Sequence, residues 1–317
     1  MAASNDAASA GEHTPVLYQN VLAALPLHAA GRYIDGTVGA GGHASGILEG
    51  STPEGLLLGL DRDPRALEIA GERLAPYEGR VFLRRGSYAQ MHEYASELGW
   101  QSVDGILLDL GLSSMQLDEA GRGFSFQAEG PLDMRFGPDA PTSASRLVNE
   151  LEVEALADII WRYGEESRSR RIARAIERAR PLKTTTELAE VVARAVGRSK
   201  RGLHPATKTF QALRIAVNEE LEVLERGLEI GSDLLGPGGR LVVISFHSLE
   251  DRIVKHFFRQ ASKDCICPPE TPVCVCDHQA SLKVITPRPI RPEKAEIQVN
   301  PRSRSAKMRV AERLPVA

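Results

Sequence analysis

The stretch VDGILLDLGLSSMQ, residues 103–116, indicates the fold class of this chain. Its first half is a short, nearly continuous apolar run, which is typical of a strand buried on both faces of a parallel sheet. The run ends at Asp109 and is followed by the polar pair Ser113 and Ser114. A carboxylate at the carboxyl end of a central strand lies where open α/β sheets bind ligands. Asp109 could instead cap a following helix, but the rest of the chain supplies a nucleotide-type site for it to face.

A glycine-rich turn follows an earlier predicted strand. Tyr33 and Ile34 lead into Asp35 and then GTVGAGGHASGIL. A strand, a glycine turn and a helix in this order let the backbone approach a bound nucleotide closely. Residues 39–44 also fit the pattern G-x-G-x-x-G/A, although glycine-rich turns are common. The turn therefore indicates a cofactor site only together with its surroundings.

Two later strand ends carry residues that suit a nucleoside. The second predicted strand, residues 55–60, ends at Asp61, where an acid that binds ribose hydroxyls is expected. Asp61 could alternatively cap the helix predicted over residues 64–74. The third strand, residues 80–85, is followed by Tyr88, which could stack on adenine or be half-buried core. The repeated strand and helix pattern predicts a parallel sheet with helices on both faces.

After residue 116 the alternation of strand and helix stops. Apolar residues recur at helical spacing from residue 151 to 197, with no strand between the helices. We therefore predict an inserted helical domain over residues 118–206. The sheet is expected to resume beyond it, with helices over residues 207–235 and a strand that ends next to His247.

The insert is strongly basic. Residues 162–214 contain 14 Lys or Arg and 5 Glu, a local charge of +9 in a chain whose net charge is -3. Because phosphates dominate the affinity of proteins for nucleic acid, this asymmetry predicts a polyanion contact. A solvated helix face is the alternative. The crowding of Arg168, Arg170, Arg171 and Arg174 favours the polyanion.

All four cysteines lie in one segment, as Cys265, Cys267, Cys274 and Cys276. Four thiolates can hold zinc, although partners in zinc sites are usually separated by two to four residues rather than one. A reduced loop or a redox-dependent pairing is the alternative. The basic tail over residues 283–313 is expected either to lie along RNA or to form a solvated extension.

The composition is that of an ordinary globular protein, with 42% hydrophobic and 26% charged residues. No apolar run of about 18 residues exists, so no membrane span is predicted. Residues 1–12 lack the basic and apolar regions of a secretory signal and are expected to form a disordered tail. Because cysteine is otherwise absent, the cytoplasm is the expected compartment.

Several stretches together resemble one family, the bacterial 16S ribosomal RNA cytosine-N(4) methyltransferases. They are HTPVL (13–17), DGTVGAGGH (35–43), LDRDP (60–64), DGILLDLGLSS with Gln116, RGFSF and GPLDMR (within 122–135), HPATKTFQALRIAVNEEL (204–221) and SFHSLEDRIVK (245–255). The resemblance implies a Rossmann-like class I methyltransferase sheet, formed by residues 13–117 and 207–317, with the helical insert recognising substrate. It also implies S-adenosylmethionine as donor and a cytidine of the decoding region as acceptor. Whether the substrate is naked RNA or the assembled small ribosomal subunit stays open, as does the oligomeric state.

Site residues follow from the resemblance position by position. It implies donor contacts at Gly41, Gly42, His43, Asp61, Tyr88, Asp109 and Gln116. The family usually has phenylalanine where Tyr88 stands, so an aromatic ring is kept. The family also tends to have an aromatic shortly after the Gly-Glu-Glu of the insert, where this chain has Ser167 and Arg168.

The residues themselves favour methylation of nitrogen over carbon. A ring carbon of cytosine needs a cysteine nucleophile near the cofactor, and no cysteine precedes Cys265. Transfer to an exocyclic amine needs only acceptors for its N–H groups and an in-line approach. We expect Asp109, Ser113 and Ser114 to hold the amine and His247 to contact the base, which must be unpaired or flipped out. Asp109 could serve donor, acceptor or both.

Two other classes of protein also use such a glycine loop. A nicotinamide oxidoreductase would carry a second nucleotide-binding half or a catalytic domain in place of a basic helical insert. A non-catalytic RNA-binding protein would not be expected to keep both Asp61 and Asp109 beside the loop.

Overall fold

The computed structural model describes residues 15–197, 204–268 and 273–315. The predicted tail over residues 1–12 lies outside the described residues, as do three cations of the basic count, Arg198, Lys200 and Arg201. Within the described ranges, no helix is long and apolar enough to span a membrane.

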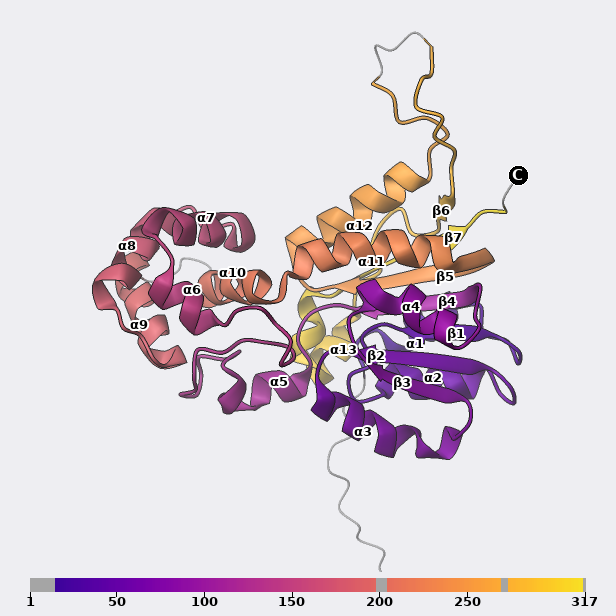
Figure 1. The fold of residues 1–317 in the computed structure, drawn as a ribbon, viewed down its shortest axis with the longest axis horizontal. Helices are drawn as coiled ribbons and strands as arrows, with labels where there is room; N and C mark the ends of the chain where they lie inside the picture. The colour runs from indigo at the N-terminus through magenta and orange to yellow at the C-terminus, as the bar shows by residue number, and fades with distance from the viewer. Residues whose placement is uncertain (1–14, 198–203, 269–272, 316–317) are drawn as a thin grey trace, which may run out of the picture.

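A sheet of seven strands forms the centre of the molecule (Figure 1). Its spatial order is β3 (Val81–Arg85), β2 (Leu56–Asp61), β1 (Arg32–Asp35), β4 (Val103–Asp109), β5 (Leu235–Ser245), β7 (Lys307–Arg313) and β6 (Leu282–Val284). The first five strands are parallel, and β7 is antiparallel to both of its neighbours. This topology confirms the predicted Rossmann-like methyltransferase sheet.

The apolar run of β4 is buried on both faces of the sheet, as its sequence predicts. Ile106 and Leu108 belong to the core beneath one helical layer, whereas Leu107 belongs to the core on the other face. The first layer contains α4 (Met91–Glu97), α11 (Glu220–Leu234) and α12 (Ser248–Ala261). The second contains α1 (Tyr18–Ala24), α2 (Gly42–Gly50) and α3 (Pro64–Leu74). Two-sided burial fixes β4 at the centre, so that its carboxyl end faces the middle of the binding edge.

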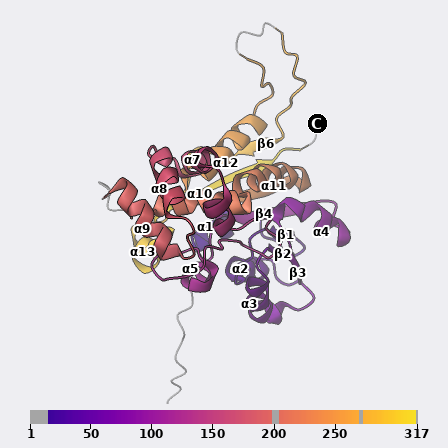
Figure 2. The same ribbon diagram turned by 60° about the vertical axis from the view of Figure 1, so that its left-hand side comes forward.

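The segment between β4 and α11 folds into helices with a core of their own, beside the sheet in Figures 1 and 2. The helices are α5 (Ser114–Asp118), α6 (Ala144–Glu150), α7 (Val153–Gly164), α8 (Ser169–Ala179), α9 (Thr185–Val196) and α10 (Thr207–Asn218). Phe210, Leu213 and Val217 of α10 are buried in this helical core. We therefore propose that the inserted unit extends through α10 rather than ending at residue 206.

Short elements complete the chain. The described residues also form the 3-10 turns η1 (Ala75–Tyr77), η2 (Tyr88–Gln90), η3 (Ala120–Arg122) and η4 (Pro301–Ser305), and the helix α13 (Lys294–Val299). The Gly-Pro-Gly-Gly segment at residues 236–239 is included in β5, where the register with β4 jumps from Leu235 to Arg240.

The end of the basic tail is part of the sheet. Lys307–Arg313 forms β7, with Met308 and Val310 buried, so the expectation of an extension along RNA or in solvent is wrong for this segment. Lys307 and Arg309 lie 2.9 and 2.7 Å from the carboxylate of Asp251 in α12. The ion pairs compensate two of the three cations of β7, which occupies an interior position of the sheet.

Candidate active site

A pocket of about 840 Å³ opens where the parallel strands end. Its wall contains residues 36–39 after β1, Asp61 at the end of β2, residues 86–88 after β3, residues 109–113 at β4 and Phe246 after β5. Six of the seven predicted donor residues line it, namely Gly42, His43, Asp61, Tyr88, Asp109 and Gln116. Gly41 is the N-cap of α2 and packs against Leu74 instead, because its φ of 79° brings the backbone close to α3.

Asp61 is held in place by the glycine loop. Its Oδ2 accepts a hydrogen bond from the Gly39 N–H (2.9 Å) and its Oδ1 accepts one from the Asp63 N–H (2.9 Å). The N-cap of α3 is Asp63, whose side chain accepts from the Arg65 N–H, so the alternative that Asp61 caps this helix is wrong. Burial raises the pKa of Asp61 to about 6.

Gln116 and Ser113 are tied to each other and to Asp63. The Gln116 side chain donates to Asp63 Oδ2 (3.2 Å), and its Oε1 accepts from the Ser113 N–H (3.2 Å). Ser113 is the N-cap of α5, and its Oγ accepts from the Gln116 N–H. Ser114 is the first residue of α5, and its side chain lies outside the described part of the structure, so its predicted role stays a prediction. The polar pair therefore starts a helix, and Ser113 lines the pocket.

The ring of Tyr88 is fixed between the sheet and α11. A Cβ atom added at Gly227 of α11 would lie 2.4 Å from the ring, so only glycine fits there. Burial raises the pKa of the Tyr88 hydroxyl, and the nearby carboxylates of Glu250 and Glu220 raise it further. The tyrosine stays neutral, with one edge toward an acidic cluster, and its stacking on adenine stays a prediction.

Asp109 carries an unsatisfied acceptor. Its Oδ1 is buried and forms no hydrogen bond with any described residue, whereas its N–H donates to Thr37 Oγ1 (2.7 Å). Its Oδ2 lies 3.7 Å from Nδ1 of His43, and the other ring nitrogen of His43 lies 3.0 Å from the Val16 carbonyl oxygen. That carbonyl requires the proton on Nε2, which leaves Nδ1 without one.

Among the described residues, no cation forms an ion pair with Asp109. Burial lowers the pKa of His43 to about 4, so its ring is neutral at pH 7. Burial raises the pKa of Asp109 well above its usual value, and Asp35 and Glu250 raise it further by repulsion. A carboxylate with one buried, free acceptor, placed near other acids and beside a neutral imidazole, is suited to a cationic ligand with N–H donors.

A second charged cluster forms part of the pocket wall. It consists of Arg214, Glu220, His247 and Glu250. The Arg214 guanidinium forms two 2.8 Å hydrogen bonds with the Glu220 carboxylate. Glu250 accepts from the N–H groups of Phe246 (2.8 Å) and His247 (3.2 Å), and its other oxygen lies 3.1 Å from His247 Nε2. Burial would raise the pKa of Glu250, but His247, Arg214 and the backbone donor outweigh it and lower the pKa.

The cluster changes which residues are assigned to the site. Arg214, Glu220 and Glu250 line the pocket, whereas His247 does not and instead caps α12. Sequence reasoning missed the first three residues. The signal was present, because they lie in the long stretches over residues 204–221 and 245–255 that carry the family resemblance.

Three exposed arginines of the insert have no partner among the residues that the structure describes. Arg170, Arg171 and Arg174, here called the α8 arginines, are exposed and form no ion pair with another described residue. Other basic residues of the insert are already engaged. Arg180 donates to the carbonyls of Val148 and Leu151, and Lys208 donates to the carbonyl of Glu165. The cations available to a polyanion are therefore fewer than the sequence count suggests.

Comparison with known proteins agrees with the resemblance over almost the whole chain. The sequence profile of the MraW methylase family matches residues 10–314. A protein of Dehalococcoides mccartyi, named ribosomal RNA small subunit methyltransferase H, is 55% identical over 302 residues, which cover 95% of this chain and 86% of the relative. Relatives with the same name from Thermomicrobium roseum and Nitratidesulfovibrio vulgaris are each 53% identical, and cover 94% and 95% of their own lengths. The chain belongs to the MraW methylase family and is an S-adenosylmethionine-dependent methyltransferase.

Proposed function

We infer that this protein transfers the methyl group of S-adenosylmethionine to the exocyclic N(4) amine of a cytidine in the decoding region of 16S ribosomal RNA. The observation that carries the inference is the buried, unsatisfied Oδ1 of Asp109 at the centre of the strand-end pocket. The family membership agrees with it, because the relatives are named as methyltransferases of small-subunit ribosomal RNA. The nicotinamide and non-catalytic alternatives are thereby set aside.

The donor half of the pocket fits an adenosyl group. Asp61 offers carboxylate lone pairs to ribose hydroxyls while the Gly39 N–H holds it in place. Tyr88 and Gly42 line the same half, and Asp109 lies at its inner end. When bound, S-adenosylmethionine supplies an electrophilic methyl group on a positively charged sulfur. The positive charge on this sulfur would offset the negative charges of the Asp35, Asp61 and Asp109 carboxylates, whose pKa values are raised.

Asp109 has the properties needed to orient the amine of cytosine. The lone pair of this amine is delocalised into the ring, so an acceptor must hold an N–H group and turn the nitrogen toward the methyl group. The free Oδ1 of Asp109 can accept that N–H. As the nitrogen gains a bond to carbon its proton becomes acidic, and the raised pKa makes Asp109 a stronger base for it than an exposed aspartate.

The charged cluster positions the wall opposite the glycine loop. Glu250 binds the Phe246 N–H and so fixes the start of α12, and Arg214 of α10 pairs with Glu220 of α11 and so joins these two helices. Phe246 and Phe136 both line the pocket and offer apolar surface to a flat base. Because a paired base could not reach the foot of this pocket, we propose that the cytidine enters unpaired or flipped out.

The α8 arginines support a contact with the ribosomal RNA backbone. They are exposed and unpaired within the described residues, and phosphate contacts of this kind supply affinity without reading sequence. We propose that the insert holds the RNA while the sheet domain carries the chemistry. We further propose the small ribosomal subunit as the physiological substrate and the cytoplasm as its compartment.

Nucleoside mass spectrometry on ribosomal RNA tests the proposal. Small subunits and naked 16S RNA, both from a strain lacking this protein, are incubated with the enzyme and labelled S-adenosylmethionine. The expected product is N(4)-methylcytidine at one site in the decoding region. A label on ring carbon or ribose would contradict the mechanism, and transfer to naked RNA alone would contradict the assembled subunit as substrate.

A further inference from the structure

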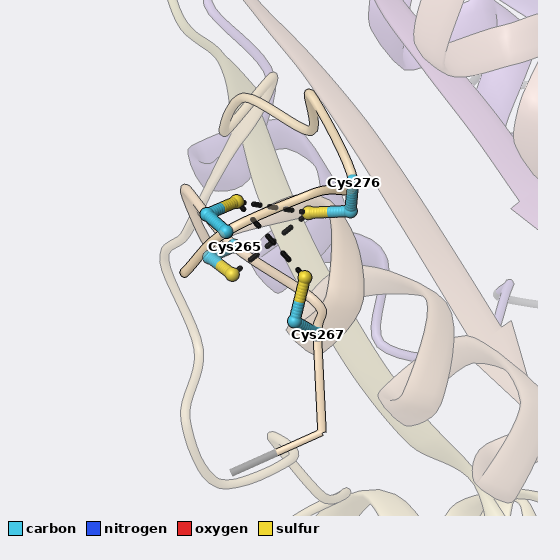
Figure 3. Close-up of side chains that lie close together, drawn as sticks. Cys265, Cys267 and Cys276 are labelled. Atoms are coloured by element: carbon cyan, nitrogen blue, oxygen red, sulfur yellow. Dashed lines mark hydrogen bonds between the residues drawn. The ribbon is translucent and has the colours of Figure 1, made fainter. Parts of the chain in front are cut away.

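The four cysteines lie in the segment between α12 and β6, which projects from the sheet domain (Figure 1). Their sulfur atoms face a common centre, as Figure 3 shows for Cys265, Cys267 and Cys276. The Sγ–Sγ distances are 3.5 Å between Cys274 and Cys276, 3.8 Å between Cys276 and Cys265, and 4.0 Å between Cys267 and Cys274. All four sulfurs lie within 4.8 Å of one another.

These distances fit a tetrahedral metal site. Zinc binds thiolate sulfur at about 2.3 Å, and the edge of such a tetrahedron is therefore about 3.8 Å. The three Sγ–Sγ distances given above, 3.5–4.0 Å, bracket this value. A disulfide would instead need about 2.05 Å between two sulfurs. We propose that Cys265, Cys267, Cys274 and Cys276 together bind one zinc ion in a closed structural site.

Backbone groups of the loop support the sulfurs in that arrangement. The Ile266 N–H points at Cys276 Sγ (3.5 Å), and the Val275 N–H points at Cys267 Sγ (3.5 Å). Each strand of the loop thus donates to a sulfur of the other strand. Donors of this kind orient metal ligands and stabilise their deprotonated form. The single-residue spacing within each pair places one backbone donor between two ligands.

The described residues of the loop, 262–268 and 273–281, form no apolar core that could fix it without a metal. Ile266, Val273 and Val275 are 45%, 70% and 76% exposed, so their side chains do not pack together. At its base the loop is joined to α12 by the Ser281 N–H, which donates to the Ala261 carbonyl (2.9 Å). A short segment without a core needs a cross-link, and in a reducing compartment a metal serves where a disulfide does not.

The site lies far from the pocket, so its role is structural. Helix α12 starts beside the pocket at Ser248 and ends at Ala261, and its 14 residues span about 21 Å. Removing zinc should therefore loosen the loop while leaving the affinity for S-adenosylmethionine unchanged. This separation also keeps the zinc proposal independent of the proposed function.

Metal and thiol counts on the tag-free full-length protein test the proposal. We expect about one zinc per chain by mass spectrometry, and Co²⁺ exchanged into the site should show the visible bands of tetrahedral thiolate coordination. Because the chain has only 4 cysteines, a thiol reagent gives an unambiguous count. Few thiols should react in the native protein, and all should react after denaturation with a chelator and no reductant.

Two variants separate the site from the loop around it. Replacing Cys267 and Cys274 by serine should abolish zinc binding, whereas the matched control Val273→Thr changes the exposed tip and should retain it. Calorimetry with S-adenosylmethionine verifies that both variants are folded. Metal-free protein whose thiols all react in the native state would overturn the proposal. Thiols that stay unreactive after denaturation without reductant would show disulfides, and would overturn it as well.

Discussion

Replacing Asp61 by asparagine should weaken donor binding and also remove part of its pH dependence. In the free protein, burial raises the pKa of Asp61 to about 6. In the proposed complex, ribose hydroxyls donate hydrogen bonds to the carboxylate, so we expect the donor to bind the charged form and to lower that pKa. Because the donor favours the deprotonated state, its affinity should rise as the pH rises through 6.

The size of both effects can be worked out from the structure. Losing hydrogen bonds to a charged group costs about 1.5–3 kcal/mol, which raises the Kd about 12- to 160-fold at pH 8. For a group whose pKa is about 6, roughly one molecule in 11 is ionised at pH 5, so Asp61 alone should weaken binding about tenfold between pH 8 and pH 5. In Asp61→Asn this contribution disappears.

Isothermal calorimetry with S-adenosylmethionine at pH 5, 6, 7 and 8 measures the difference. Asp35, whose burial raises its pKa to about 7, titrates in the same range, so the wild-type slope contains more than one group. The slope of wild type minus that of the variant isolates Asp61. Asp158→Asn, at an exposed carboxylate of α7, is the matched control. Equal affinities at pH 8, or parallel slopes, would refute the assignment of Asp61 to the ribose.

Three further changes test other parts of the argument. Asp109→Ala should lower turnover on small subunits at least about a hundredfold, as measured by nucleoside mass spectrometry, and an unchanged rate would show that the β4 end has another role. Changing the α8 arginines to glutamine should flatten the salt dependence of RNA affinity by about 0.7 in slope per lost contact, whereas Arg194→Gln, at a residue paired with Glu190, should not. Arg214→Met should destabilise the protein by about 3–5 kcal/mol in urea unfolding, because it leaves Glu220 buried and unpaired, and adding Glu220→Leu should restore most of the loss.

The central sheet could be predicted because each of its parallel strands has a recognisable local sequence pattern. The apolar runs that end at Asp35, Asp61 and Asp109 are buried on both faces, and each acid marks a strand end. β7 could not be predicted in this way. Two of its three cations, Lys307 and Arg309, are neutralised by Asp251, which lies more than 50 positions away in the sequence. The local sequence pattern predicts that such a segment is exposed to solvent, because the segment itself contains no information about its distant partner.

The same limit applies to the candidate site. The residues after β1 to β4 follow directly from strand ends and the glycine loop, so sequence alone placed them. Arg214 and Glu220 flank the junction of α10 and α11, and they reach the pocket only because the helical insert folds back onto the sheet domain. His247 was expected to face the base, but the N–H groups at the start of α12 use its ring as a cap. Tertiary packing decides whether a polar side chain caps a helix or remains free to bind a ligand.

The charges in the pocket couple the binding of S-adenosylmethionine to the protonation state that Asp109 needs in order to bind cytosine. Asp109 lies near other acids, and its imidazole neighbour, His43, is held neutral by burial, with its Nε2 proton directed at the Val16 carbonyl. In the free protein the raised pKa favours protonated Asp109, which cannot accept a proton from an amine. A sulfonium cation brought next to it stabilises the carboxylate and lowers that pKa. We therefore expect donor binding to favour the charged form of Asp109, which can accept an N–H from cytosine, and we expect the base to bind productively only after the donor.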